Sequence, residues 1–319
     1  MGDKRERAEA MELAQDGIHK ITKRKTSAIG WTDFSGGPLN FVMGCTPVSE
    51  GCAHCYARRI YERFGHNFTD VRFDPAKFSR LWRMRFPEYS PKRGAPHRPM
   101  LFLVDTADLF HEALGDDLGF AAFRWTVEVA IERPGLVFQV LTKRARRMYE
   151  MVERWREAFL AELPPNLWLG VSAENQKRAD ERIPLLLDTP AAVRFVSVEP
   201  MLGPITMREE WMVSYEEYQH VYRVTREMAL DSGQPGREGE PYRGPTEPVY
   251  GPSPLSWVIC GAESGPNRRP FDVQWAVDLY EQCREAGVPF FGKQDSDMRP
   301  GKPLVLGDYG VVQEWPEEA

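Results

Sequence analysis

Residues 167–175 read LWLGVSAEN, five residues without a charge that are followed at once by polar side chains. Short, almost wholly apolar runs of this kind are typical of strands that a parallel sheet buries on both faces. Five other runs share this character, and polar residues follow each of them. They are MLFLV (100–104), LVFQVL (136–141), VRFVSV (193–198), WVICG (257–261) and VPFFG (288–292). The pattern predicts a sheet of parallel strands.

Amphipathic stretches separate these runs and predict helices at 117–132, 144–161, 176–187 and 272–286. The third contains Pro184, which interrupts the pattern and leaves the end of that helix open. Most successive runs lie about 26 to 36 residues apart, which is the size of a βα unit. Together with a seventh run, LNFVM (39–43), they predict an α/β fold. We expect a full or partial (β/α) TIM-like barrel, with a doubly wound open sheet as the alternative.

One gap between runs is longer than the others and predicts an insertion at 208–254. Its first part, 208–232, is predicted to form a helical hairpin or lid, and its second part, 233–254, contains eleven Pro or Gly among 22 residues, which is typical of an irregular loop. We therefore predict a basic N-terminal extension (1–28), a barrel (29–300) that carries this helix-plus-loop segment, and a C-terminal tail (301–319).

Composition and charge exclude some classes of protein. The chain has no run of about 18 uncharged apolar residues, so we expect no membrane span. Its first residues are too charged for a secretory signal, which predicts a cytoplasmic protein. The net charge of −6 argues against a protein that is basic throughout. Basic residues nevertheless form local clusters that could meet phosphates: Lys20, Lys23, Arg24 and Lys25; Arg58, Arg59 and Arg63; Arg80, Arg83 and Arg85; and Lys143, Arg144, Arg146 and Arg147.

Polar residues come directly after each predicted strand of the sheet. In parallel α/β folds these strand ends face one mouth, where active sites are built. We expect the side chains to line such a site. They are Asp105, Thr106 and Asp108; Lys143; Ser172, Glu174 and Asn175; Glu199; Glu263; and Lys293.

Three cysteines lie within residues 44–59, GCTPVSEGCAHCYARR. Clustered cysteines in a reducing compartment favour a metal site over disulfides. A structural zinc normally takes four ligands, so three thiolates favour a centre with one open position. A zinc module with His54 or His66 as fourth ligand is the alternative. The two remaining cysteines, Cys260 and Cys283, are predicted to be small buried residues.

The arrangement resembles the radical S-adenosylmethionine (SAM) superfamily. In that superfamily three cysteines after the first strand of a partial barrel hold a [4Fe–4S] cluster, SAM chelates the fourth iron, and one electron cleaves SAM to give a radical that takes a hydrogen atom from the substrate. The resemblance implies that Cys45, Cys52 and Cys55 hold the cluster, and that an external one-electron reductant is needed. Six residues separate the first two cysteines here, where the superfamily commonly has three. His54 precedes the last cysteine, at a position that implies an adenine contact.

A narrower resemblance covers nearly all of residues 29–294 except the insertion. The stretches that carry it are IGWTD, NFVMGCTPVSEGCAHCYARR, DTADLFHE, FQVLTKR, LWLGVSAENQKRADERIPLLL, VRFVSVEPMLGPI, WVICGAESGPNRRP and AGVPFFGKQ. They are similar to a phage and bacterial three-cysteine radical-SAM-like family. Some phage members belong to pathways that build hypermodified thymines in viral DNA. This implies an aminomutase-type isomerase that acts on a modified thymine base in the host cytoplasm.

The resemblance also implies roles for the strand-end residues. Asp105, Thr106 and Asp108 would bind the SAM amino group, and Ser172, Glu174 and Asn175 its ribose or carboxylate. Asp105 or Ser172 could instead cap a helix. Gly261 would let the backbone approach the adenine.

Four charged residues are then left for the substrate: Lys143, Glu199, Glu263 and Lys293. Alternatively they form structural ion pairs, Lys143–Glu199 and Lys293–Glu263. The substrate itself stays open among DNA, a free nucleotide, RNA and a peptide. If it is DNA, the basic clusters at the N-terminus and at Arg144–Arg147 would track the phosphates.

Overall fold

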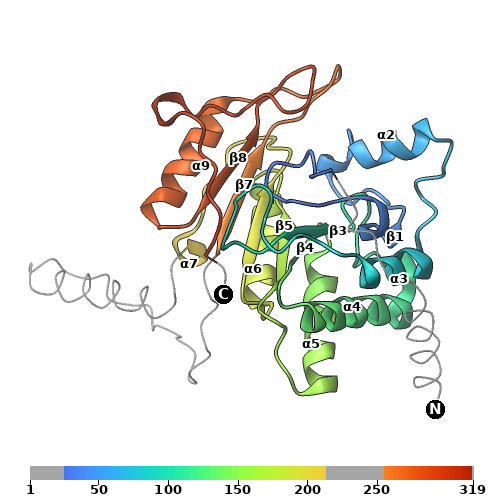
Figure 1. Ribbon diagram of the computed structural model, residues 1–319. Helices are drawn as coiled ribbons and strands as arrows, with labels where there is room; N and C mark the ends of the chain where they lie inside the picture. The colour runs from blue at the N-terminus through green and yellow to red at the C-terminus, as the bar shows by residue number, and fades with distance from the viewer. Residues whose placement is uncertain (1–24, 213–254, 318–319) are drawn as a thin grey trace, which may run out of the picture.

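The computed structural model describes residues 25–212 and 255–317. Its centre is a six-stranded parallel sheet in the order β3–β4–β5–β6–β7–β8, which curls into half a barrel (Figure 1). The six apolar runs found in the sequence supply these strands. They are β3 (Met100–Leu103), β4 (Val137–Thr142), β5 (Leu167–Ser172), β6 (Arg194–Val198), β7 (Trp257–Gly261) and β8 (Phe290–Gln294).

The strand order distinguishes the two predicted architectures. Each strand lies beside its neighbour in sequence, so the order never reverses, whereas a doubly wound sheet must reverse at a switch point. The α/β prediction is confirmed as a partial barrel. Met100 pairs with Val137 at one edge of the sheet, and Ile259 pairs with Phe291 near the other edge.

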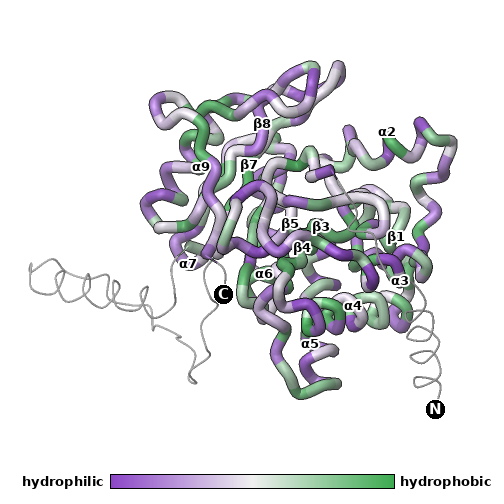
Figure 2. The backbone as a smooth tube through the Cα atoms, viewed as in Figure 1, coloured by the Kyte–Doolittle hydropathy of each residue, from purple (hydrophilic) through white to green (hydrophobic). Residues whose placement is uncertain are grey.

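Four helices cover the convex face of the sheet, and all four were predicted. They are α4 (Gly115–Glu132), α5 (Ala145–Phe159), α6 (Gln176–Asp188) and α9 (Val273–Glu285). Pro184 lies inside α6, and the helix continues past it to Asp188. Asn175 begins α6 by accepting a hydrogen bond from the Arg178 backbone N–H at 3.1 Å. Figure 2 shows apolar stretches along α4 and α6, and residues of these helices such as Phe123 and Leu186 belong to the buried core.

The prediction of a seventh barrel strand at 39–43 is wrong. Only β1 (Val42–Met43) forms there, and it pairs antiparallel with β2 (Arg72–Phe73), outside the main sheet. Pro38 lies in a 3-10 helix, η1 (Gly37–Leu39), that takes the first residue of the stretch, and Asn40 caps it. A bridge from Phe34 to Leu101 places an earlier segment beside β3 instead. The cysteines therefore follow a short strand of a separate two-stranded sheet and not a barrel strand.

The remaining described elements connect these layers. They are η2 (Glu50–Cys52), α2 (Tyr56–Arg63), α3 (Pro75–Arg83), η3 (Glu112–Leu114), α7 (Glu209–Met212) and η4 (Gly307–Tyr309). Of the predicted insertion, 208–212 contains α7, and 213–254 lies outside the described residues, as does 1–24 of the N-terminal extension. The C-terminal stretch covers β8, where the Gly292 N–H donates to Val312 O at 2.8 Å. Among the helices that the structure describes, none is long and apolar enough to cross a membrane.

The sheet buries both faces, and the concave face is filled with large rings. Alternation along the strands turns every second residue toward this face. The ring-bearing residues there are Trp31, Phe102, Trp168, Phe195, Trp257 and Phe291. Gly170 makes room for them, because a Cβ at that position would lie 2.6 Å from the Phe195 ring. The rings form a floor, and the residues beyond them at the strand ends are polar.

Candidate functional site

The three clustered cysteines lie on one loop, residues 44–55, between β1 and α2. Cys52 ends η2, and Cys55 is the residue before α2. Gly44 begins the loop at φ 80°, and a Cβ there would lie 2.3 Å from the Asp70 carbonyl oxygen. All three thiols are half-buried. The loop therefore carries three partly buried cysteines.

Arg144 holds the first part of the cysteine loop. Its Nη1 lies 3.7 Å from Cys45 Sγ, and its Nη2 donates to the Thr46 carbonyl oxygen at 3.2 Å. The guanidinium is buried and paired with Asp108 at 3.0 Å and with Glu112 at 2.7 Å. Because its buried charge is paired with two carboxylates, the arginine fixes the loop without an exposed cation.

Asp108 is committed to this network and does not point into the mouth. Its carboxylate accepts hydrogen bonds from Thr142 Oγ1 at 2.7 and 2.9 Å and from the Phe110 N–H at 3.0 Å. The side chain is only 6% exposed. Both carboxylate oxygens of Asp108 are therefore occupied, so neither is free for the predicted contact with a SAM amino group. In the structure Asp108 supports Arg144 and, through it, the cysteine loop.

The surroundings of Cys45 also set its protonation. Burial and the nearby Asp108 carboxylate raise the pKa of the Cys45 thiol to about 11, although Arg144 acts in the opposite direction. Cys45 also interacts electrostatically with Cys52. A metal centre takes cysteine as thiolate, so loading this loop releases protons.

Glu174 holds the middle of the cysteine loop. It is fully buried, accepts hydrogen bonds from Ser49 Oγ and from the Gly51 N–H at 3.3 Å, and pairs with Arg182 at 2.9 Å. A Cβ at Gly51 would lie 2.7 Å from Glu174 Oε1, so the close approach requires glycine. Burial opposes ionisation, but Lys143 and Arg182 keep the pKa of Glu174 below its usual value. Glu174 thus acts on the loop, although it was predicted to bind SAM.

The other predicted SAM contacts lie in two places. Asp105 and Thr106 are half-buried at the end of β3, where the Asp105 carbonyl oxygen accepts a hydrogen bond from Tyr56 OH and Thr106 Oγ1 accepts one from Asn40 at 2.8 Å. Ser172 is buried at the end of β5. Asn175 caps α6 and donates a hydrogen bond to Glu50 in the cysteine loop.

The ends of β6 and β8 bring Glu199 and Lys293 together on the concave side. Lys293 Nζ lies 2.9 Å from Glu199 Oε1, and Trp31 Nε1 donates to Glu199 Oε2 at 3.3 Å. Both charged side chains keep some exposure, 24% for Lys293 and 14% for Glu199. A Cβ at Gly261 would lie 2.7 Å from Glu199 Oε1, so this glycine admits a carboxylate where we expected an adenine ring.

The predicted ion pairs are therefore wrong in their partners. Lys293 pairs with Glu199, and Glu263 pairs with Arg269. Lys143 is half-buried and influences Glu174 instead. The error has a simple origin, because strand order alone cannot specify which of several strand-end charges meet.

His54 joins the cysteine loop to the end of β7. Its Nδ1 lies 3.0 Å from Glu263 Oε2, and Glu263 also binds Arg269, whose Nη1 donates to the Glu50 carbonyl oxygen at 2.8 Å. Arg269 and His54 hold the pKa of Glu263 below its usual value against the effect of burial. The loop is thus tied to both flanks of the mouth.

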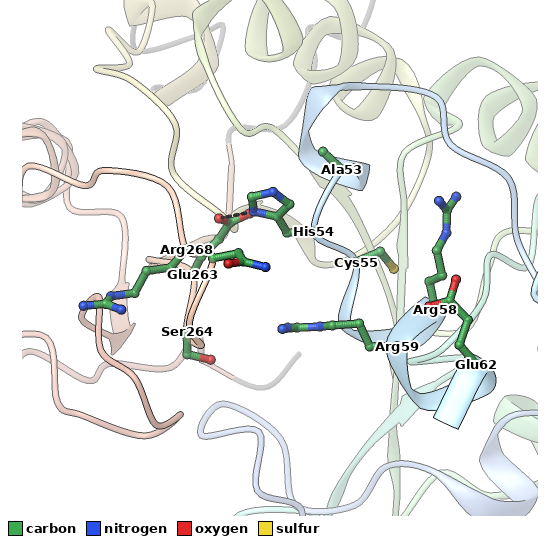
Figure 3. Close-up of a pocket in the computed structure, with 10 residues that line it drawn as sticks. Ala53, His54, Cys55, Arg58, Arg59, Glu62, Glu263, Ser264 and Arg268 are labelled. Atoms are coloured by element: carbon green, nitrogen blue, oxygen red, sulfur yellow. Dashed lines mark hydrogen bonds and ion pairs between the residues drawn. The ribbon is translucent and has the colours of Figure 1, made fainter. Parts of the chain in front are cut away.

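A pocket of about 220 Å³ opens between α2 and the loop after β7. Cys55 and His54 line one side, and Glu263 and Ser264 the other (Figure 3). Arginines contribute most of its remaining charge: Arg58, Arg59 and Arg268. The third cysteine therefore faces a basic pocket.

Single-ion sites require ligands that converge on one point. Among residues 25–212 and 255–317, no three His, Cys, Asp or Glu side chains do so. In the zinc alternative, His54 is engaged with Glu263, and His66 packs its ring edge-on against Tyr61. A cluster places each thiolate on a different iron, so it needs three separate sulfur atoms. The donor set of this loop, three half-buried thiols with Cys260 and Cys283 buried in the core, fits that requirement.

The basic cluster predicted at Arg144–Arg147 is not a phosphate surface as a whole. Arg144 is buried in its ion pairs, and Arg147 pairs with Asp116 at 2.9 Å. Lys20, Lys23 and Arg24 lie outside the described residues. The cluster of basic residues was a poor predictor of a phosphate surface here, because arginines that follow a strand can turn inward when acids surround them.

Several supporting residues were not singled out from the sequence. Trp31, His111, Arg182 and Arg269 each contact a strand-end acid or the cysteine loop. Their partners lie at least eight positions away except in the Arg269–Glu263 pair, so no short motif marks them. The pair Glu263 and Arg269, six residues apart on one loop, is the only one that a local charge pattern could have indicated.

Comparisons with known proteins give a family and no activity. A family model described as "Protein of unknown function (DUF5131)" matches residues 26–304. No curated protein matches the chain. No solved structure matches it. The matched range spans the six-stranded sheet, the cysteine loop and the strand-end residues.

Proposed function

We propose that this chain, which belongs to the DUF5131 family, is a radical SAM enzyme. The observation that carries the proposal is the donor set: three half-buried thiols on one loop at the mouth of a partial barrel, with the other two cysteines buried elsewhere. Cys45, Cys52 and Cys55 would hold a [4Fe–4S] cluster. When bound, such a cluster would supply the electron that cleaves SAM, the chemistry that removes a hydrogen atom from a substrate.

The chain's own residues would position the loop and the ligands. Arg144 and Glu174 hold the cysteine loop by hydrogen bonds to Thr46 and Gly51, and the contact between His54 and Glu263 ties the loop to the end of β7. The ring-filled floor of the half barrel keeps water away from the concave side. Asp105 and Thr106, half-buried beside Tyr56, would meet the SAM amino group.

Glu199 and Lys293 would receive the substrate. The pair presents a carboxylate and an ammonium on the concave face, so it can exchange partners with the ammonium and carboxylate of an amino-acid group. Lys143 adds a second cation at the end of β4, on the other half of the mouth. This arrangement supports the aminomutase-type isomerisation of a modified thymine base in DNA that the family resemblance implies. A free nucleotide, an RNA or a peptide with such a group is the alternative substrate.

The base would have to leave the DNA stack to reach the concave face, at a cost of a few kcal/mol. The enzyme would act in the cytoplasm, where the clustered cysteines stay reduced, and would draw its electron from an external reductant.

SAM cleavage tests the proposal. The protein, reconstituted with iron and sulfide without oxygen and then reduced, should convert SAM to 5′-deoxyadenosine and methionine. Glu199→Gln should keep the uncoupled cleavage and lose transfer of deuterium from a labelled base side chain into 5′-deoxyadenosine. Absence of SAM binding by the reduced, iron-loaded protein would contradict the proposal.

A further inference from the structure

The pocket beside Cys55 contains polar groups that the cysteine loop does not use. Arg59 lies on α2, and Ser264 and Asn267 lie on the loop after β7. Within the described part of the chain, these three side chains make no hydrogen bond or ion pair with the protein. They are donors of three kinds, a guanidinium, a hydroxyl and an amide, gathered around one cavity.

Arg59 is the cation that is free to act. Figure 3 shows its side chain extending from α2 across the pocket toward Ser264. The other two arginines of the pocket are engaged: Arg268 donates to Ser296 Oγ at 3.1 Å and to Gly265 O at 3.1 Å, and Arg58 lies over the Phe68 ring at 5.8 Å. A guanidinium without an acceptor at the edge of a pocket is suited to an incoming anion.

The wall opposite Arg59 is held in place before any ligand arrives. The backbone of Ser264 forms an isolated parallel β-bridge with that of Asp297, and the Gly265 N–H donates to the Asp297 carbonyl oxygen at 2.9 Å. Gly265 has a φ of 110°, and a Cβ there would lie 3.2 Å from Arg59 Nη1. Glycine therefore keeps the gap open between the arginine and this wall.

The charge and size of the pocket indicate the ligand. Three arginines line it against two glutamates, and Arg269 already neutralises Glu263. Its volume of about 220 Å³ is below the range of about 300–1,000 Å³ that is usual for whole small-molecule ligands. The pocket suits one compact anion and the group attached to it.

We infer that Arg59, Ser264 and Asn267 form a subsite for a phosphate group of the nucleotide substrate. Guanidinium, hydroxyl and amide donors are the groups that proteins use to hold phosphate oxygens. The position beside Cys55 would fix the substrate at the mouth by its phosphate while its base reaches the concave face. The identity of the substrate as a nucleotide rests on the proposed function, but phosphate binding needs no loaded cluster.

Equilibrium binding to the full chain tests the subsite. The probes are a fluorescent single-stranded thymidine oligonucleotide, dTMP and thymidine. Arg59→Gln should weaken binding of the oligonucleotide about tenfold, because a charge-assisted hydrogen bond is lost. It should also reduce the slope of log affinity against log salt by about 0.7. Binding of thymidine, which has no phosphate, should stay unchanged.

A matched control separates the subsite from general charge. Arg63→Gln removes the same charge from the exposed end of α2, outside the pocket, and should alter binding less than about twofold. Asn267→Ala changes the opposite wall and should weaken binding about threefold, which keeps the test valid if substitutions on α2 disturb the helix. Comparison of dTMP with the oligonucleotide tells whether the phosphate belongs to a free nucleotide or to a strand.

Two results would overturn the inference: Arg59→Gln protein that binds the oligonucleotide as tightly as the parent, or an equal loss with Arg63→Gln. Failure of SAM cleavage together with an intact Arg59 effect would count against the proposed function alone. Normal SAM cleavage without an Arg59 effect would count against the subsite alone.

Discussion

At the ends of β3 to β5, Asp108, Arg144 and Glu174 are buried and bind one another or the cysteine loop. At the ends of β6 to β8, Glu199 and Lys293 are paired but keep part of their side chains in solvent. The two halves of the same mouth thus use charge differently. The first half is a support for the loop, and the second half can change partners when a ligand arrives.

The difference follows from the cost of burying charge. A fully buried ion is tolerated only when every oxygen or N–H has a partner, so Asp108 and Glu174 each accept several hydrogen bonds. A partly exposed pair loses less when it separates, because water replaces the partner. Burial of a strand-end charge therefore separates loop supports from ligand contacts better than its position in the sequence does.

The largest effect is expected at Arg144. Arg144→Met leaves Asp108 buried without its cation and should lower the free energy of unfolding by about 3–5 kcal/mol. Arg156→Met, which removes an arginine that is 33% exposed and paired with Glu153 and Glu162, should cost no more than about 1 kcal/mol. Urea unfolding of both variants measures the contrast. Equal losses would show that burial does not distinguish the two halves.

A smaller effect is expected at Gly51. Gly51→Ala forces a methyl group to within 2.7 Å of Glu174 and should cost about 1–3 kcal/mol. The matched control is Gly203→Ala, since a Cβ at Gly203 meets no atom within 4 Å. The control should change the free energy of unfolding by less than about 0.5 kcal/mol. If both variants unfold alike, Glu174 does not support the loop as closely as described.

The smallest effect on stability is expected at the second half of the mouth. Lys293→Met should lower the free energy of unfolding by about 1 kcal/mol or less, because Glu199 keeps access to solvent and a hydrogen bond from Trp31. The same variant should lose product formation while its iron content stays normal. A loss of stability as large as that of Arg144→Met would make the pair a structural one.

Strands and helices were predictable because their signal is local. Runs such as LVFQVL and WVICG are apolar on both sides, and that pattern has few solutions other than a buried parallel strand. The same rule failed for LNFVM, where Gly36, Gly37 and Pro38 turn the chain just before the run and a 3-10 helix ends on its first residue, Leu39. Local backbone preference there outweighed apolar character.

The candidate site was predictable as a place but not as a set of contacts. Strand-end positions brought Glu199, Glu263 and Lys293 to one mouth, as the parallel topology requires. Their pairing depended on side-chain direction across strands far apart in sequence, which no spacing rule contains. Lys293 on β8 reaches Glu199 after β6 over Gly261 of the strand between them, which has no side chain in the way, while Arg269 pairs with Glu263 within the loop after β7.

Iron and sulfide content tests the central claim most directly. After reconstitution without oxygen, the parent protein should hold one [4Fe–4S] cluster, and Cys45→Ala, Cys52→Ala and Cys55→Ala should each lose it. Cys260→Ala and Cys283→Ala, which change thiols buried in the core, should retain the cluster. Full iron and sulfide content in the Cys52→Ala protein, or colourless parent protein that binds zinc instead, would contradict the account.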